Sequence, residues 1–122
     1  MEINRFHKGR AGEDAAADFL ARNGMKIVER NFRCPSGEID IIARDGKTIV
    51  FVEVRSTGGT KFGHAEESLI ARKRRRVVNA ALWYLKKSAR EHASARIDVV
   101  AIRWNEGKPE INWIVNAFEA RS

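Results

Sequence analysis

The sequence contains a single cysteine, Cys34, only two prolines in 122 residues, and no long hydrophobic run. One cysteine cannot form an intrachain disulfide, and it excludes a zinc site built from several cysteines. No apolar stretch approaches the roughly 20 residues that cross a bilayer, and the N-terminal segment lacks the apolar centre of a signal peptide. We therefore expect a soluble, cytoplasmic protein that has no membrane partner.

The composition is that of a folded globular protein. Hydrophobic residues make up 43% of the chain and charged residues 32%, with nine glycines and no low-complexity tract. A chain of this length can bury one hydrophobic core but is too short for two ordinary domains. We expect one domain that spans residues 1–122.

Positive charge is concentrated in the second half of the chain. The net charge is +7, and the segment from Arg72 to Arg90 holds eight basic residues and no acidic one. Clustered lysine and arginine gain affinity for a polyanion by releasing the counterions condensed on its phosphates. A solvated helix face explains the same run of charge equally well.

The spacing of apolar residues predicts two helices and five strands. A helix over residues 8–24 is followed by strands over 25–32, 38–44 and 48–55, a helix over 66–90, and strands over 95–104 and 110–118. The glycine-rich segment 56–65 is predicted to be a flexible loop. The order αβββαββ predicts an α/β fold with a mixed five-stranded sheet flanked by helices.

The pair Asp45-Gly46, between two β-branched segments, predicts a two-residue hairpin loop. If these two residues form the loop, Glu38 lies opposite Glu53, and Asp40 is a diagonal neighbour of Glu53 on the same face. Arg55 joins that face because it is two residues after Glu53. The other face is then filled by apolar residues: Ile39, Ile41, Val50, Val52 and Val54.

Three carboxylates within reach of one another repel. At ~6 Å and an effective dielectric of ~20, each pair costs roughly 3 kcal/mol, so either their pKa values rise or a cation binds. Mg²⁺ takes oxygen ligands and commonly uses one or two protein carboxylates, a number that Asp40 and Glu53 supply. Alternatively, Glu53 pairs with Arg55, or Glu38 with an arginine of the long helix, in solvent-exposed ion pairs of little energetic consequence.

Glu13 lies on the same predicted helix face as Ala16 and Leu20. A carboxylate on the inward face is costly unless it is paired or bound to a cation. The alternative is that Glu13 lies in the first helical turn, where the helix dipole favours an acidic residue.

Four segments together resemble one protein family. They are KGRAGEDAAADFLARNG (8–24), RNFRCPSGEIDIIARDGKTIVFVEVR (30–55), FGHAEESLIARKRRRVVNAALWYL (62–85) and RIDVVAI (96–102) with the later NAF. Nearly the whole chain is similar, in order, to the bacterial YraN-like proteins of uncharacterised protein family 0102. That family is similar to the restriction-endonuclease-like superfamily, which includes archaeal Holliday junction resolvases. The resemblance implies a single domain of restriction-endonuclease-like fold.

In that superfamily an acid on the first helix, an Asp on the second strand and Glu-x-Lys on the third strand form the metal and catalytic site. The resemblance therefore implies a catalytic set of Glu13, Asp40, Glu53 and Arg55, with the first three as ligands of Mg²⁺ or Mn²⁺. Arg55 stands where the motif has lysine. Arginine can bind phosphate, but it is effectively never deprotonated and cannot carry a proton. Lys73, near the inward face of the long helix, could supply an ammonium instead.

The function that the resemblance implies is metal-dependent hydrolysis of DNA phosphodiester bonds, with branched or otherwise structured DNA as a candidate substrate. The residues expected to contact nucleic acid are Arg55, Lys61, Lys73, Arg74, Arg75 and Arg76. The alternative is a nucleic-acid-binding protein that has kept the fold but lost turnover, because Arg55 replaces the motif lysine. A protein-interaction module would explain the basic helix but not the acids. The sequence leaves open whether the protein forms a homodimer.

Overall fold

The computed structural model describes the backbone of residues 2–58, 62–90 and 92–118 and the side chains of residues 10–56, 72–90 and 92–117. The elements are α1 (Glu2–Arg22), β1 (Lys26–Cys34), β2 (Gly37–Asp45), β3 (Thr48–Gly58), α2 (Phe62–Lys87), β4 (Ala95–Asn105) and β5 (Lys108–Phe118). The predicted α/β fold with the order αβββαββ is confirmed. No helix in this part of the chain is long and apolar enough to cross a membrane.

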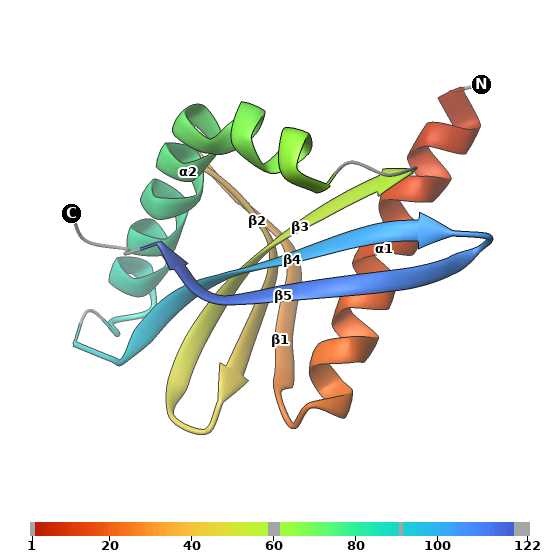
Figure 1. Ribbon diagram of the computed structural model, residues 1–122. Helices are drawn as coiled ribbons and strands as arrows, with labels where there is room; N and C mark the ends of the chain where they lie inside the picture. Colours follow the sequence, from red (N-terminus) through yellow and green to blue (C-terminus); the bar gives the residue numbers. More distant parts are fainter. Residues whose placement is uncertain (1, 59–61, 91, 119–122) are drawn as a thin grey trace.

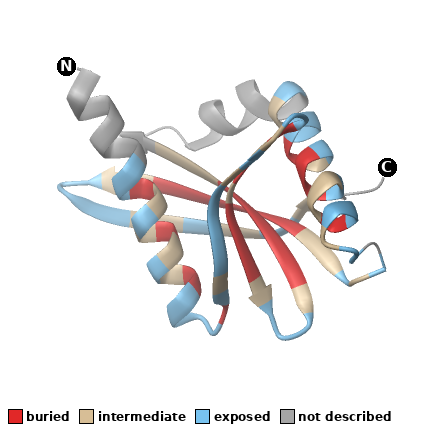
Figure 2. Ribbon diagram, turned by 180° about the vertical axis from the view of Figure 1, so that it is seen from behind, coloured by how far each residue is buried: buried red, intermediate tan, exposed pale blue. Residues whose placement is uncertain are grey.

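The five strands form one mixed sheet in the order β1-β2-β3-β4-β5. Neighbouring strands are antiparallel except β3 and β4, which are parallel because α2 carries the chain back between them. The two helices cover opposite sides of the sheet (Figure 1). A separate core therefore forms under each helix, and buried residues concentrate on the central strands (Figure 2).

The core under α1 contains small and branched side chains. Ala16 and Leu20 of α1 are fully buried against the sheet, as the apolar spacing predicted. The helix ends at Arg22 and is followed by Gly24, which has a φ of 93°, and the N–H of Met25 donates to the carbonyl of Leu20 at 3.1 Å. This core fixes α1, and with it Glu13, against the sheet.

The core under α2 combines aliphatic and aromatic side chains. The buried residues of α2 are Val77, Ala80, Ala81 and Leu85. They pack around Phe51 of β3, whose ring lies 5.7 Å from the ring of Tyr84 in an edge-to-face arrangement. These residues form the inward face of α2 from Val77 onward, while the side chain of Ile70 lies outside the described residues.

The pairing register of the β2–β3 hairpin is shifted by two residues from the predicted register. Asp45 pairs with Thr48, so Gly46 and Lys47 form the loop, and Arg44 pairs with Ile49. The predicted loop required positive φ at both central residues, whereas of these two only Gly46 has one, at 63°. A shift of two residues keeps the side chains of the paired stretch on their predicted faces.

The strands β2 and β3 separate beyond Ile41 and Val52, the last pair of their ladder. In the described backbone, residues 37–40 then pair only with β1, and residues 53–58 pair only with β4. Ile39 belongs to the core under α2, so the prediction that it shares a face with Ile41 is wrong. The alternation of faces fails here because β2 turns away from β3.

The predicted loop over residues 56–65 is mostly strand and helix. β3 continues to Gly58, and α2 begins at Phe62, earlier than the predicted start at Glu66. Lys61, which was predicted to contact nucleic acid, lies outside the described residues. The prediction of a long flexible loop beside the charged strand end is therefore wrong.

Two glycines allow the helices to approach the strands closely. A Cβ at Gly12 of α1 would lie 2.8 Å from the Cβ of Ser56 on β3. A Cβ at Gly37 of β2 would overlap the carbonyl oxygen of Arg76 in α2. Both contacts need glycine because no larger residue leaves this space. They hold α1 and α2 at the end of the sheet where β2 and β3 separate.

Candidate functional site

Asp40 lies at the point where β2 and β3 separate. The ladder ends at the pair Ile41–Val52, and Asp40 and Glu53 are the next residue on each strand. In the shifted register they are direct rather than diagonal neighbours. The N–H of Val54 donates to Asp40 Oδ2 at 2.8 Å, in the place that a β2 carbonyl would take in a continued ladder. The predicted pair of carboxylates is therefore brought together.

The pKa of the Asp40 carboxyl is strongly raised. Burial raises it from an ordinary value of 3.8 to about 7, and the negative charge of Glu53 adds to the effect. The hydrogen bond from Val54 and the ammonium of Lys73 oppose the rise, while the charge of Glu13 makes a further small contribution to it. Asp40 therefore changes charge near neutral pH, which is a common property of functional carboxyls.

Glu53 is almost fully buried, with 2% of its surface exposed. The ammonium of Lys73 in α2 lies 3.0 Å from Glu53 Oε2. This contact lacks the alignment of a hydrogen bond, so among the described residues Oε2 has an ionic partner but no hydrogen-bond donor. The alternative of a solvent-exposed ion pair at Glu53 is wrong because the carboxylate is buried.

Glu13 approaches the site from α1, on the opposite side of the sheet from α2. It lies in the middle of α1, so a first-turn position does not explain it. Its Oε1 accepts hydrogen bonds from Asn31 Nδ2 at 2.9 Å and from Arg30 Nη2 at 3.0 Å. One oxygen of Glu13 is thus held by β1, and its charge is close enough to Asp40 to influence the pKa of that residue.

Arg55 and Glu38 were both predicted to lie on the charged face, and only Arg55 does. Arg55 is half-buried on β3, on the same side of the strand as Glu53. Glu38 pairs with Arg33 across β1 and β2, and Arg33 Nε lies 3.5 Å from Glu38 Oε1. The predictions that Glu38 faces Glu53 or a helix arginine are wrong because β2 turns away from β3.

The basic residues of α2 lie on two sides of the helix, as the helical period requires. Lys73 is half-buried and faces the carboxylates. Arg74, which was predicted to contact nucleic acid, is exposed. The exposed residues, which we call the arginine band, are Arg72, Arg74, Arg75 and Arg76. The structure therefore brings Lys73 into the site and leaves the arginine band on the outer surface of the helix.

Asp98 is a buried acid that the sequence reasoning missed. Its carboxylate accepts the N–H of Asn116 at 2.8 Å and the indole N–H of Trp113 at 3.0 Å, and Arg96 Nε lies 3.0 Å away. Asn116 has a φ of 55°, and the β4–β5 ladder shifts register beside Asp98. Asp98 therefore stabilises an irregular stretch of the sheet. The signal in the sequence is a lone acid inside the apolar segment IDVVAI.

Asp40 and Glu53 have the chemistry of a site for a divalent cation. Carboxylate oxygens are the ligands that Mg²⁺ and Mn²⁺ prefer, and Glu53 Oε2 becomes available if the flexible side chain of Lys73 withdraws. Within the described residues, no three Asp, Glu, His or Cys side chains lie close enough together to hold one metal ion. The role of Glu13 as a third ligand therefore stays a prediction.

The fold and the site define a small α/β protein with paired carboxylates where two central strands separate. Residues 12–102 match the model of the uncharacterised protein family UPF0102. The UPF0102 protein of Geobacter metallireducens is 44% identical over 119 residues, which are 98% of either chain. That of Desulfosudis oleivorans is 46% identical over 120 residues, 98% of this chain and 96% of the relative. This chain belongs to the UPF0102 family, as its sequence motifs predicted.

Proposed function

We propose that this protein is a divalent-metal-dependent nuclease that hydrolyses DNA phosphodiester bonds. The observation that carries the proposal is that Asp40 and Glu53 lie side by side where β2 and β3 separate. This arrangement agrees with the motif of the restriction-endonuclease-like nucleases that the sequence resembles. The arginine band on α2 adds positive charge beside Lys73, which suits a substrate with a phosphate backbone.

In this proposal Asp40 and Glu53 hold Mg²⁺ or Mn²⁺. Bound there, the ion would activate a water for attack and stabilise negative charge on the phosphate. Asp40 is suited to the role because a carboxyl with a pKa of about 7 gives up its proton at neutral pH when a cation binds. The N–H of Val54 holds the carboxylate in place through its bond to Oδ2.

Arg55 and Lys73 divide the role of the motif lysine between them. Arg55 keeps a positive charge on β3 and has the planar donors that bind phosphate oxygens. Lys73 supplies an ammonium that already lies 3.0 Å from Glu53, and an ammonium, unlike a guanidinium, can transfer a proton. Lys73 of α2 therefore compensates for the arginine that replaces the motif lysine at position 55.

Nucleic-acid binding without turnover is the second candidate, and the contact between Lys73 and Glu53 favours it. If the ammonium stays on Glu53 Oε2, it replaces the cation that hydrolysis needs. Arg55 cannot then take over proton transfer. The arginine band would still bind phosphates, so the protein would retain affinity for nucleic acid.

Cleavage assays separate the two candidates. The substrates are single-stranded, duplex, flapped and four-way-junction DNA, each with Mg²⁺ or Mn²⁺. Asp40→Asn and Glu53→Gln remove charge while keeping size. The matched control is Asp18→Asn, because Asp18 is an exposed acid of α1 whose ion pair among the described residues is with the exposed Arg22 at 2.9 Å.

The nuclease proposal expects metal-dependent cleavage that either site variant lowers by about a hundredfold or more and that the control leaves unchanged. Even residues that only support a metal ligand commonly cost ten- to a hundredfold, so loss of a ligand should cost at least about as much. DNA binding that survives both variants, without cleavage of any substrate in either metal, would establish the second candidate and reject the nuclease.

A further inference from the structure

A polar cavity lies toward the turn of the β2–β3 hairpin, away from the paired carboxylates. It has a volume of about 240 Å³, and its walls come from the start of β1, from β2 and β3 near their turn, and from the end of α2. The charged and polar residues that line it are Lys26, Arg44, Tyr84 and Arg90. None of them belongs to the proposed nuclease site.

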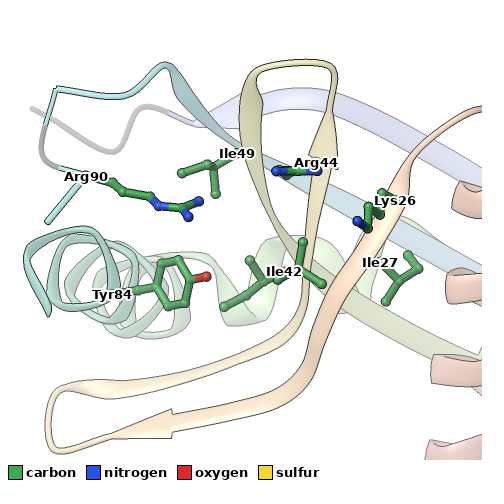
Figure 3. A pocket seen from close by; sticks show the side chains of 8 residues that line it. Lys26, Ile27, Ile42, Arg44, Ile49, Tyr84 and Arg90 are labelled. Atoms are coloured by element: carbon green, nitrogen blue, oxygen red, sulfur yellow. The ribbon is translucent and has the colours of Figure 1, made fainter. Parts of the chain in front are cut away.

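The cations of this cavity come from three elements and face one another. Lys26 and Arg44 are direct partners across β1 and β2, an arrangement that is unfavourable for two like charges. Figure 3 shows Lys26 and Arg90 pointing into the cavity from opposite sides, with Ile42 below them in this view. Within the described residues no acid forms an ion pair with any of the three cations. An anion between them would relieve the repulsion.

Arg44 and Tyr84 add donors to the cavity. The Nε of Arg44 is buried and has no hydrogen-bond partner among the described residues, so a ligand would reach the terminal nitrogens of this half-buried guanidinium. The ring of Tyr84 is held edge-to-face by Phe32, at 5.3 Å, and by Phe51, at 5.7 Å. Its hydroxyl points toward the cavity (Figure 3). A ligand with several anionic oxygens would accept hydrogen bonds from both the Arg44 guanidinium and the Tyr84 hydroxyl.

We propose that this cavity binds a phosphate group, either of a small molecule such as a nucleotide or of a nucleic-acid strand. Guanidinium, ammonium and phenol groups are all donors to phosphate oxygens, and arginine suits phosphate geometry especially well. The volume is below the roughly 300–1,000 Å³ of pockets for larger ligands, so it fits a phosphate with little attached to it. The inference does not depend on the proposed nuclease activity.

The test is calorimetric titration in EDTA, so that no divalent metal contributes. The ligands are inorganic phosphate, a nucleoside monophosphate, a short DNA strand, and the same strand with an uncharged methylphosphonate backbone. The cavity variants are Arg44→Gln and Arg90→Gln. The matched controls are Lys47→Gln and Lys108→Gln, which remove the same charge at exposed positions outside the cavity.

Each cavity variant should weaken phosphate binding by about tenfold or more, because each removes a charge-assisted contact, while the controls should stay near wild type. Losses for phosphate and nucleotide identify a small-molecule ligand. A loss confined to the charged strand identifies the backbone. Arg90 is exposed after the end of α2, so Arg90→Gln keeps the test valid even if Arg44→Gln fails to fold.

Two results would overturn the inference: no binding of any of these ligands by the wild type, or equal affinities in cavity and control variants. Asp40→Asn separates this site from the proposed nuclease site. It should bind phosphate as the wild type does in EDTA, and a tenfold stronger affinity, from the loss of charge repulsion, would assign the phosphate to the carboxylate site instead.

Discussion

At the residue scale, two neighbouring carboxylates share one buried region and are neutralised in different ways. The pKa of Asp40 is raised to about 7, so this residue can hold a proton near neutral pH. Glu53 instead contacts the ammonium of Lys73. A proton, a lysine or a metal ion can each reduce the repulsion between the two acids. The charge of the site therefore depends on pH and on the position of Lys73.

The raised pKa of Asp40 predicts how stability changes with pH. The carboxyl has a pKa near 3.8 in the unfolded chain and about 7 in the folded protein, so the folded state holds the proton more tightly between these values. The contribution to stability is present below the lower value and is lost as the pH rises to the upper one. In urea unfolding with EDTA, Asp40→Asn should lose less stability than wild type between about pH 4 and pH 7. Asp18→Asn should follow the wild type, and parallel profiles for all three proteins would show that the pKa of Asp40 is not raised.

Removing the ammonium from the site should have two opposite effects. Lys73→Gln leaves the buried Glu53 carboxylate without this cation, so the free energy of unfolding should fall by about 1–3 kcal/mol, less than for a fully buried pair because Lys73 is partly exposed. Affinity for Mn²⁺ should rise because the ammonium no longer competes for Glu53. Chemical unfolding and calorimetry measure the two quantities, with the exposed Arg75→Gln as control. Weaker Mn²⁺ binding by Lys73→Gln would mean that Lys73 does not compete with the metal.

At the element scale, the helices hold the site from two sides through close contacts with strands. Gly12 allows α1 to touch β3 at Ser56, and Glu13 is the next residue along the helix. Gly37 allows the start of β2 to touch the backbone of α2 at Arg76, less than one helical turn after Lys73. The position of each helix therefore determines where its charged side chain meets the carboxylates.

Gly12→Ala tests the contact between α1 and β3. Alanine stabilises a helix by about 1 kcal/mol relative to glycine, but overlap of its Cβ with Ser56 should cost about 1–3 kcal/mol. We expect Gly12→Ala to destabilise the wild type and to stabilise a Ser56→Gly variant, in which the overlapping atoms are absent. A double-mutant cycle of unfolding free energies measures this reversal. A stabilising effect of Gly12→Ala in both backgrounds would contradict the close contact.

At the scale of the whole molecule, the net charge is +7, and the basic residues gather in separate regions of the surface. The arginine band covers the outer surface of α2, and the cations of the polar cavity lie near the hairpin turn. The paired carboxylates lie between the two helices. Under the proposed function, such a surface would attract the phosphates of a polyanion, an attraction that does not depend on base sequence.

The arginine band should set the salt dependence of DNA binding. Changing Arg72, Arg75 and Arg76 together to glutamine should reduce the slope of log affinity against log salt by up to about 2–3, because each phosphate contact contributes about 0.9. The loss should be similar for different DNA sequences. Fluorescence anisotropy at several salt concentrations in EDTA measures the slope, with Lys47→Gln/Lys108→Gln as a control. An unchanged slope in the triple variant would exclude the arginine band as the DNA-binding surface.

The order of the elements could be predicted because apolar periodicity and turn residues are local properties of the chain. The hairpin register could not be predicted in the same way. The Asp-Gly pair suits hairpin loops that place Gly46 either first or second, and packing of the sheet decides between them. Asp40 and Glu53 were assigned to one face by the period of two residues, although the ladder ends at Ile41 and the period fails at Ile39. Their proximity could therefore be predicted, although the residues that pair along the hairpin could not.

The errors at Glu38 and Ile39 have one physical cause. A period of two residues extrapolates a straight strand, whereas β2 turns away from β3 after Ile41. The contact between Lys73 and Glu53 depends on how closely α2 approaches the sheet, which is a property of tertiary packing. No local pattern in the sequence predicts the distance between Lys73 and Glu53.

Calorimetric titration with Mn²⁺ in the presence of DNA tests whether Asp40 and Glu53 hold a divalent cation. We expect saturable Mn²⁺ binding by the wild type and by Asp18→Asn. Asp40→Asn should lose it, because the variant removes one of the two proposed ligand charges. Absence of Mn²⁺ binding by the wild type, or equal binding by Asp40→Asn, would contradict the claim.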